Sequence, residues 1–270
     1  MKPSNSSKLF CPICSSIYQN QMPLHTIVYG SCNICQHKYL LGNKKFLLKN
    51  ARSFEEKTIR SNGEILNKTS TASFHRRKSA VNSIKSTLLT PFINKNLSIL
   101  DMSCDTGTLF KFNPQLYKGF NEFVGVDIFN IFSSQEVEFE RKTETLSKEF
   151  KSKRFDLILM VNYLEYSYCS YSEIIESLSL LKKNGNICVA VPLDNNPQSN
   201  YLSRINEFSN KSFDIFLENI ELPYESRIIN KYGTAIISYQ LTGVDISPGP
   251  SLIASLSRPI ASSPITPLTS

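Results

Sequence analysis

Apolar segments alternate with helical patterns in the second half of the chain, from about residue 97 onward. Phe155–Val161, with the sequence FDLILMV, is nearly all apolar, as is typical of a strand buried on both faces of a sheet. Four further segments predict strands: residues 97–102, 122–128, 137–142 and 186–191. Helical patterns fall between them, including residues 171–183, which Asn184 and Gly185 close. The alternation predicts an α/β fold, with a Rossmann-like parallel sheet and helices on both faces.

The segments that flank this region follow other patterns. Residues 74–93 repeat apolar positions at helical spacing, which predicts a helix before the first strand. Residues 213–219 fit a short helix, and residues 220–230 and 234–241 fit a C-terminal antiparallel hairpin. Residues 246–270 contain five prolines and seven serines, a composition that predicts a disordered tail.

Four cysteines near the start form two pairs, Cys11 with Cys14 and Cys32 with Cys35. The spacing C-x2-C-x17-C-x2-C lies in the range of a four-cysteine zinc site, because each short gap lets one tight turn aim two sulfurs at the same ion. Four free cysteines are one alternative. A redox CxxC pair is another, but neither pair opens a helix after a strand.

A zinc ribbon over residues 1–49 is therefore expected, with structural Zn²⁺ and a small core of its own. His25 and His37 are surplus to four sulfurs and are expected at the surface. A helical connector is predicted over residues 50–95, the α/β domain over residues 96–245, and the tail over residues 246–270.

Charge is unevenly distributed along the chain. Residues 1–100 hold 15 Lys and Arg residues against three acids, whereas residues 101–270 hold 15 against 20. A basic first part favours an anionic partner, and charges spread over solvated faces are the alternative. No apolar stretch reaches 18 residues, so no membrane span is expected. No secretory signal is visible, which favours a cytoplasmic location with reduced thiols.

A candidate cofactor site begins where residues 97–102 run into the turn Ser103-Cys104-Asp105-Thr106-Gly107. Ligands of parallel sheets bind at the carboxyl ends of the strands, where small residues let the backbone approach them. About 20 residues further on, Asp127 ends the next predicted strand, and an acid there can accept hydrogen bonds from ribose hydroxyls.

These segments resemble four motifs of the class I S-adenosylmethionine-dependent methyltransferases, in family order, over about residues 97–193. Residues 100–109 are similar to the first motif, commonly Leu-Asp-Ile-Gly-Cys-Gly-Thr-Gly. Residues 124–127 (VGVD) match the end of the second strand. Residues 155–166 resemble the fourth strand and its LEH sequence, and residues 180–192 resemble the family's LLKPGG segment.

The resemblance implies S-adenosylmethionine as cofactor and gives each matching residue a role. Asp101 would brace the turn, and the backbone from Ser103 through Asp105 to Gly107 would face the methionine part. Asp127 would hold the ribose, Glu144 would lie near the adenine, and Asn162 would line the pocket floor. Ser103 and Asp105 replace family glycines, and Tyr166 replaces a histidine. No catalytic base is identifiable, although Glu165, Tyr166 and Tyr168 follow the fourth strand.

A zinc ribbon before such a domain is similar to two groups, the sugar C-methyltransferases with related small-molecule or glycan enzymes, and a family of 23S rRNA guanine methyltransferases. We therefore expect methyl transfer to a sugar, glycan or other small, anionic metabolite. One alternative is an RNA methyltransferase whose basic ribbon holds RNA. The other is a non-catalytic binding protein on the same fold.

Overall fold

The computed structural model describes about half of the chain. The described residues are 10–18, 20–24, 27–41, 83–92, 95–104, 120–127, 139–141, 150, 153–193, 204–220, 226–229 and 234–240. Asp105, Gly107, Glu144, His25 and the tail over residues 246–270 lie outside this set, so the expectations about them stay predictions. Among the described helices, none is long and apolar enough to cross a membrane.

The larger of two sheets has seven strands in the order β10-β11-β8-β7-β4-β5-β6. Their bounds are β4 Ser98–Asp101, β5 Glu122–Asp127, β6 Phe139–Arg141, β7 Phe155–Val161, β8 Leu181–Pro192, β10 Ser226–Ile229 and β11 Thr234–Gln240. The five strands from β6 to β8 pair in parallel, whereas β11 pairs antiparallel with both β8 and β10. The predicted parallel sheet and C-terminal hairpin are thereby confirmed.

Side chains of the central strands alternate between the two faces of this sheet. One face packs against Leu89 of the helix at residues 83–89, which continues into η1 (Thr90–Phe92). The strand residues on that face are Ile99, Leu157, Leu159 and Cys188. The other face packs against Ile174 and Leu178 of α5 (Ser170–Ser179). Its strand residues include Leu100, Ile158, Met160, Ile187 and Val189. The nearly continuous apolar sequence of β7 follows from this burial on both faces.

The predicted end of the helix over residues 171–183 is wrong, because α5 ends at Ser179 and Leu181 already pairs with Phe155. The predicted closure of that helix by Asn184 and Gly185 is wrong as well, because both residues lie inside β8. Asn184 has a φ of 62°, and a Cβ added at Gly185 would lie 2.9 Å from the Lys182 carbonyl oxygen. Asparagine and glycine tolerate this local geometry, which lies between the two registers in which β8 pairs with β7.

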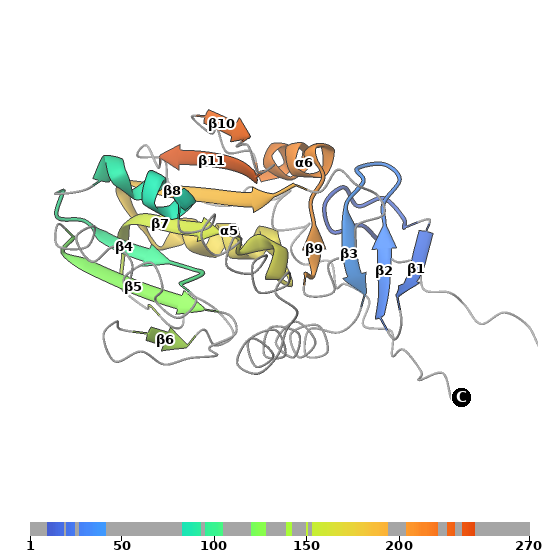
Figure 1. Cartoon of the computed structure of the whole chain (residues 1–270), viewed down its shortest axis with the longest axis horizontal. Helices are drawn as coiled ribbons and strands as arrows, with labels where there is room; N and C mark the ends of the chain where they lie inside the picture. Colours follow the sequence, from blue (N-terminus) through green and yellow to red (C-terminus); the bar gives the residue numbers. More distant parts are fainter. Residues whose placement is uncertain are drawn as a thin grey trace, which may run out of the picture.

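A second sheet of four strands has the order β1-β2-β3-β9. Three strands, β1 (Asn20–Leu24), β2 (Ile27–Ser31) and β3 (Lys38–Leu41), come from the cysteine-rich segment. The fourth, β9 (Asn206–Glu207), comes from the connection between β8 and α6 (Asn210–Ile220). Figure 1 shows β9 beside β3, and shows β4, β5, β7 and β8 pointing toward this small sheet. The cysteine-rich ribbon therefore faces the carboxyl edge of the large sheet.

The expectation that the ribbon has a small core of its own is wrong. One continuous apolar cluster joins ribbon residues such as Tyr29 and Leu40 to Phe208, Phe213 and Phe216 around α6 and to the α5 face of the large sheet. The sequence pattern could not reveal this contact, because about 160 residues separate the two sides of it.

Candidate functional site

The four ribbon cysteines lie on two turns of the same form. In the first, the Ser15 amide donates to the Cys11 carbonyl at 2.9 Å. In the second, the Gln36 amide donates to the Cys32 carbonyl at 2.8 Å. Ser15 and Gln36 each follow the second cysteine of their pair and have left-handed φ values of 59° and 62°. Each C-x2-C segment thus forms a tight turn that presents both of its sulfurs on one side.

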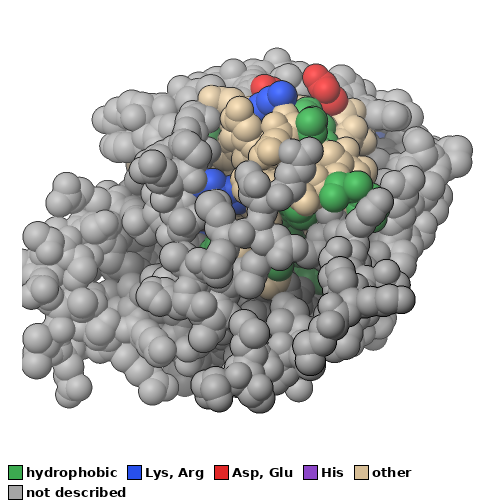
Figure 2. Space-filling model, turned by 90° about the vertical axis from the view of Figure 1, so that its right-hand side faces the viewer, with side chains coloured by type: hydrophobic (Ala, Val, Ile, Leu, Met, Phe, Trp, Pro, Cys, Tyr) green, Lys and Arg blue, Asp and Glu red, His purple; other side chains and the backbone are tan. Residues whose placement is uncertain are grey.

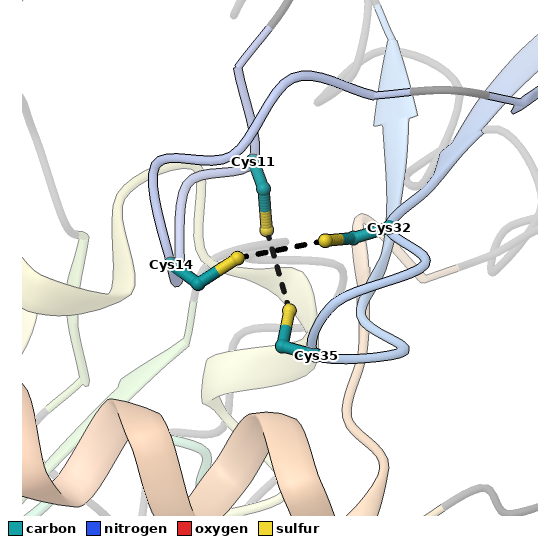
Figure 3. A group of neighbouring side chains, drawn as sticks. All are labelled: Cys11, Cys14, Cys32 and Cys35. Carbon is teal, nitrogen blue, oxygen red and sulfur yellow. Dashed lines mark hydrogen bonds between the residues drawn. The ribbon is translucent and has the colours of Figure 1, made fainter.

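The sulfurs of the two turns meet at one point, as Figure 3 shows. The Sγ atoms of Cys11 and Cys35 are 3.5 Å apart, as are those of Cys14 and Cys32, and all four lie within 4.8 Å of one another. A tetrahedral ion with metal–sulfur bonds of about 2.3 Å needs sulfurs about 3.8 Å apart. The four predicted ligands are therefore gathered as a metal site requires, and all are free thiols.

Hydrogen bonds connect the cysteine thiols to one another and to Ser16, and the thiolate is the form of cysteine that binds metals. The Ser16 hydroxyl lies 2.9 Å from the Sγ atoms of both Cys14 and Cys32. The hydrogen bond between Cys11 and Cys35 lowers the pKa of the Cys11 thiol to about 6 and raises that of Cys35, and burial raises the pKa of Cys14. One thiolate shared by the Cys11–Cys35 pair is therefore favoured, and a bound cation would favour the others. The donor set and its surroundings fit a cysteine-bound metal ion.

Side chains of α5, of α6 and of Ser209, the residue before α6, hold the two turns from outside. The carbonyl of Ile13, within the first turn, accepts hydrogen bonds from the Tyr171 hydroxyl at 3.0 Å and from Asn219 Nδ2 at 2.9 Å. The carbonyl of Cys35, within the second, accepts one from the Ser209 hydroxyl at 2.9 Å. The position of the cysteine cluster is thereby fixed relative to the α/β part of the chain.

A buried polar junction links β3 to the segment that follows β7. His37 Nε2 and Asn206 Oδ1 lie 3.2 Å apart. Asn206 Nδ2 donates to the carbonyls of Leu164, at 3.0 Å, and Ser167, at 2.6 Å. The expected surface position of His37 is wrong, since the side chain is fully buried and burial lowers its pKa to about 3. A neutral His37 therefore belongs to this junction.

The carboxyl edge of the large sheet contains a topological switch point between β4 and β7. The chain runs from β4 outward to β5 and β6, and then returns to β7 and β8 on the other side of β4. After β4 the backbone bonds to the strands on both sides. The Met102 amide donates to the Leu159 carbonyl of β7, and the Cys104 amide donates to the Val126 carbonyl of β5. Parallel sheets bind ligands in the crevice at such a point.

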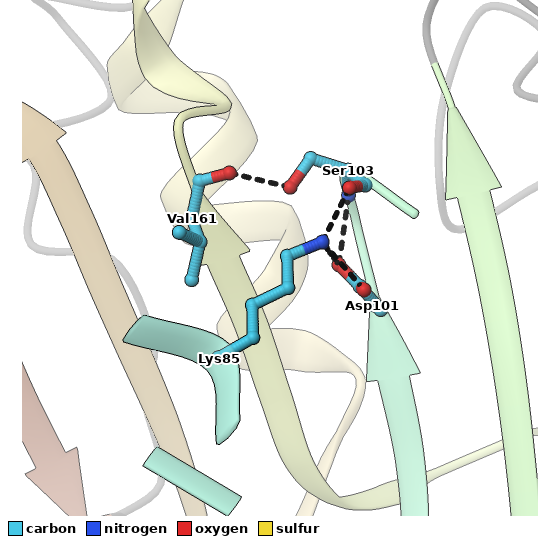
Figure 4. A network of polar contacts seen from close by, with 4 residues as sticks. All are labelled: Lys85, Asp101, Ser103 and Val161. Carbon is cyan, nitrogen blue, oxygen red and sulfur yellow. Dashed lines mark hydrogen bonds and ion pairs between the residues drawn. The ribbon is translucent and has the colours of Figure 1, made fainter. Parts of the chain in front are cut away.

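A buried ion pair braces the turn after β4, as Figure 4 shows. Lys85 Nζ lies 2.9 and 2.7 Å from the two carboxylate oxygens of Asp101 and also donates to the Ser103 carbonyl. The Ser103 amide donates to Asp101 Oδ1 at 3.1 Å. The two charged side chains are only 3% and 1% exposed. Asp101 thus contacts the turn that the family resemblance predicted it to brace. No role for Lys85 was predicted from the sequence.

Ser103 fits the position where the family has a glycine. Its hydroxyl donates to the Val161 carbonyl at the end of β7, so it ties the two strands of the switch point together (Figure 4). Ser103 is not among the described residues with positive φ. The backbone conformation therefore does not require glycine, and the side chain is directed to β7.

The other predicted cofactor residues lie at the same edge as far as they are described. Asp127 ends β5, and only its backbone is described. Asn162 directly follows β7 with a left-handed φ of 54°, and its amide donates to the Ala190 carbonyl at 2.9 Å. Its Oδ1 atom is buried and has no hydrogen-bond partner.

A methyltransferase-domain family matches residues 73–222, which is more than half of the chain. The chain belongs to this family. No curated protein matches its sequence significantly. Among solved structures, it is similar to the 1,6-didemethyltoxoflavin-N1-methyltransferase of Burkholderia thailandensis, with 14% identity, a TM-score of 0.56, and coverage of 83% of this chain and 99% of that one.

A second similar structure is the magnesium protoporphyrin IX methyltransferase of Synechocystis PCC 6803 with S-adenosylmethionine bound. Its identity is 15% and its TM-score 0.51, and the match covers 75% of this chain and 98% of that one. Both similarities show the class I methyltransferase fold. The expected family and fold class are confirmed.

The methyltransferase carries an unusual carboxyl group next to the switch point. Glu165 lies in η3 (Leu164–Tyr166), is 1% exposed, and has no hydrogen-bond partner at either carboxylate oxygen. Burial raises the pKa of Glu165 to about 7, against the opposing charge of Arg204. Tyr168 is half-buried, and its carbonyl accepts a hydrogen bond from the ribbon residue Tyr39 at 3.2 Å.

Sequence reasoning missed Lys85, the role of His37, and β9 with Asn206. Lys85 offered one signal, since it is a lysine directly beside the apolar position Ile84 of a predicted helix. Asn206 and His37 offered none, because 168 intervening residues separate the two partners of this bond.

Proposed function

We propose that this methyltransferase binds S-adenosylmethionine at the carboxyl ends of β4, β5 and β7 and transfers its methyl group to a small-molecule acceptor. The observation that carries the proposal is the braced turn after β4 at the switch point of a methyltransferase fold. The turn is held by Asp101, Lys85 and Ser103. It lies at the carboxyl ends of the strands, where parallel sheets bind ligands.

Each proposed cofactor residue has a distinct task. Asp101 holds the turn, so that the backbone from Ser103 through Asp105 to Gly107 faces the methionine part of the cofactor. Asp127 accepts hydrogen bonds from the ribose diol, Glu144 lies near the adenine, and Asn162 forms part of the pocket floor. Since Lys85 occupies both Asp101 oxygens, Asp101 acts through the turn and not on the cofactor itself.

Methyl transfer from a sulfonium is an in-line displacement with a good leaving group. The chain's main contribution is therefore to hold the methyl carbon and the acceptor atom in line and to exclude water. The ribbon lies on the side of the sheet where an acceptor would approach (Figure 1). We propose that it forms part of the wall around the acceptor.

Zinc is the metal that we propose for Cys11, Cys14, Cys32 and Cys35. Four thiolates make a closed tetrahedral site with no open position for water, so the ion is structural and takes no part in methyl transfer. The turns and sulfur distances support this assignment.

The described part of the ribbon surface is uncharged. Its exposed residues, in the part that the structure describes, carry no charge: Phe10, Ser15, Ile17, Asn33, Ile34 and Gln36. Lys38 is buried in an ion pair with Glu207 at 3.2 Å. Figure 2 shows this end of the molecule, where hydrophobic and uncharged atoms make up most of the described surface. RNA binding through phosphate contacts needs exposed cations, so an RNA acceptor would have to contact lysines outside the described residues, such as Lys44, Lys45 and Lys49.

Two similar enzymes are named for small molecules. One was solved with 1,6-didemethyltoxoflavin and S-adenosylhomocysteine, and the other is named for magnesium protoporphyrin IX. These names support the same class of acceptor for this chain, whether a sugar, a glycan unit or another metabolite.

The test is calorimetric titration of the metal-loaded protein with S-adenosylmethionine and with S-adenosylhomocysteine. Asp127→Ala should weaken binding on the order of ten- to a hundredfold, because it removes charge-assisted hydrogen bonds to the diol. Glu122→Ala is the matched control. It changes an acid at the other end of β5, in an exposed ion pair with Lys153, and should leave binding unchanged. A folded, metal-loaded wild type that binds neither compound would favour the non-catalytic alternative.

A further inference from the structure

The carboxyl group of Glu165 is buried, and no other described residue donates a hydrogen bond to its oxygens. The side chain is 1% exposed, and neither Oε1 nor Oε2 has a hydrogen-bond partner. A buried polar group without a partner lowers stability, so its presence calls for an explanation. A ligand that supplies the missing donor is one such explanation.

Two neighbours of Glu165 share this property. Asn162 Oδ1 and Ser167 Oγ are buried and have no hydrogen-bond partner either. Four side-chain oxygens between residues 162 and 167 therefore lack partners, in a single segment that follows β7. The carboxylate and amide oxygens can only accept hydrogen bonds, so a molecule that satisfies them must bring N–H or O–H groups.

The ribbon junction holds this segment in place. Asn206 Nδ2 donates to the carbonyls of Leu164 and Ser167, and the Ile205 amide donates to the Glu165 carbonyl at 2.8 Å. β9 is in turn paired with β3 of the ribbon. The backbone of Glu165 and of its neighbours is therefore held by hydrogen bonds from Ile205 and Asn206.

We infer that Glu165 is a catalytic residue that binds an N–H or O–H group of the acceptor and takes its proton. This inference rests on the proposed function, since it assigns the acceptor class of the same site. β7 borders the switch point through the bond from the Ser103 hydroxyl to Val161, and η3 begins three residues after β7 ends. Glu165 thus follows the strand end at which the methyl donor would bind.

The proton and the electrons balance in one step. The acceptor nitrogen or oxygen forms a bond to the methyl carbon while the carbon–sulfur bond breaks. The electron pair of that bond stays on sulfur and yields S-adenosylhomocysteine. The proton of the acceptor atom moves to the Glu165 carboxylate and leaves to solvent after product release. A pKa of about 7 suits a base that works near neutral pH.

The inference also sets the charge of the acceptor's reacting end. A buried carboxylate attracts a hydroxyl or amine and repels a carboxylate or phosphate, and Arg204 is the charged group that acts on it. The anionic character expected from the basic residues of positions 1–100 would then belong to a part of the acceptor away from the reacting atom.

Glu165→Gln is the informative variant, because it keeps the shape of the side chain but cannot take a proton. Its matched control is Glu176→Gln on the neighbouring helix α5. Wild type and variants would be incubated with methyl-labelled S-adenosylmethionine and a protein-free extract of cellular metabolites. Labelled products would be identified by mass spectrometry and NMR.

We expect a methyl ether or a methylamine as the product, formed on the order of a hundredfold more slowly by Glu165→Gln and at the wild-type rate by Glu176→Gln. Binding of S-adenosylmethionine should be the same in all three proteins. A methyl ester or C-methyl product, unchanged turnover in Glu165→Gln, or cofactor binding with no labelled product would each overturn the inference. Absence of cofactor binding in wild type would instead overturn the proposed function.

Unfolding measurements give a second readout that needs no acceptor. The pKa of Glu165 is raised on folding, so its stabilising contribution is complete below about pH 4.5 and is lost as the pH rises through about 7. Glu165→Gln should therefore unfold at higher urea concentration than wild type at pH 8, and the gap should narrow at pH 5. A variant less stable than wild type at pH 8 would show that Glu165 has a structural partner, which would overturn the inference.

Discussion

Lys85 and Asp101 set the conformation of the turn after β4. The pair is buried, and every oxygen of the Asp101 carboxylate is used, by the Lys85 ammonium and by the Ser103 amide. A buried ion pair adds little net stability, but loss of one partner leaves an uncompensated charge in the interior. The main effect of the pair is therefore to fix one backbone conformation of the turn after β4.

Lys85→Met should lower the free energy of unfolding by about 3–5 kcal/mol, because it leaves the Asp101 carboxylate buried and unpaired. Adding Asp101→Asn should recover much of the loss, since the amide oxygen can still accept from Ser103 without a charge. Urea denaturation would measure both. Lys153→Met, in the exposed pair with Glu122, is the control and should change stability by less than about 1 kcal/mol. A single Lys85→Met variant as stable as wild type would refute this account.

Ser103 shows how a residue can differ from its family and still serve the same element. A glycine is needed where φ is positive or where a side chain would collide with a neighbour. Ser103 does not have a positive φ, and its side chain is accommodated because its hydroxyl donates a hydrogen bond to the Val161 carbonyl of β7. The substitution therefore argues for a more firmly fixed switch point.

At the scale of elements, the two-residue strand β9 links the ribbon to the segment that follows β7. It extends the ribbon sheet through β3, and its Asn206 contacts both the ribbon and the segment after β7. The short helix η3, which carries Glu165, is thus linked to the ribbon through β9.

Asn206→Ala should remove the bonds to His37, Leu164 and Ser167 together, and lower the free energy of unfolding by about 2–4 kcal/mol. Hydrogen exchange at the amides of residues 164–167 should become faster. Asn219→Ala is the control, since it loses its bonds to Ile13 and Tyr171 but does not contact η3. Equal exchange rates in wild type and Asn206→Ala would show that β9 does not stabilise this segment.

At the scale of the molecule, the ribbon and the sheet domain share one apolar core. The shared cluster runs from Cys11 and Tyr29 through Phe208 and Phe213 to Ile158 in the large sheet. Loss of the ribbon would expose one side of this cluster to water. A metal ion bound at the proposed site would therefore stabilise the whole molecule and not the ribbon alone.

Removal of the metal by a chelator, or Cys11→Ser, should lower the melting temperature of the entire protein on the order of 10 °C. Far-UV circular dichroism and tyrosine fluorescence should report one transition, and Zn²⁺ should restore the chelated protein but not the variant. Cys169→Ser, which changes a cysteine outside the cluster, is the control and should melt like wild type. Two separate transitions would show that the ribbon folds independently.

The sequence by itself determined the elements and the local chemistry. The β7 pattern and the strand–turn pattern at residues 97–107 predicted the parallel sheet and its binding edge, because both depend on residues adjacent in the chain. The C-x2-C spacing predicted the cysteine cluster for the same reason, and the hairpin of β10 and β11 was confirmed.

Only the tertiary structure decided how these parts meet. The end of α5 depended on the pairing of Leu181 with Phe155, which ended the helix four residues before its predicted end. The burial of His37, the partner of Asp101 and the isolation of Glu165 depended on residues brought close by folding. The spacing of apolar residues along the sequence indicates which side of a helix or strand is buried. It does not indicate which side chains, distant in the sequence, pack against that side.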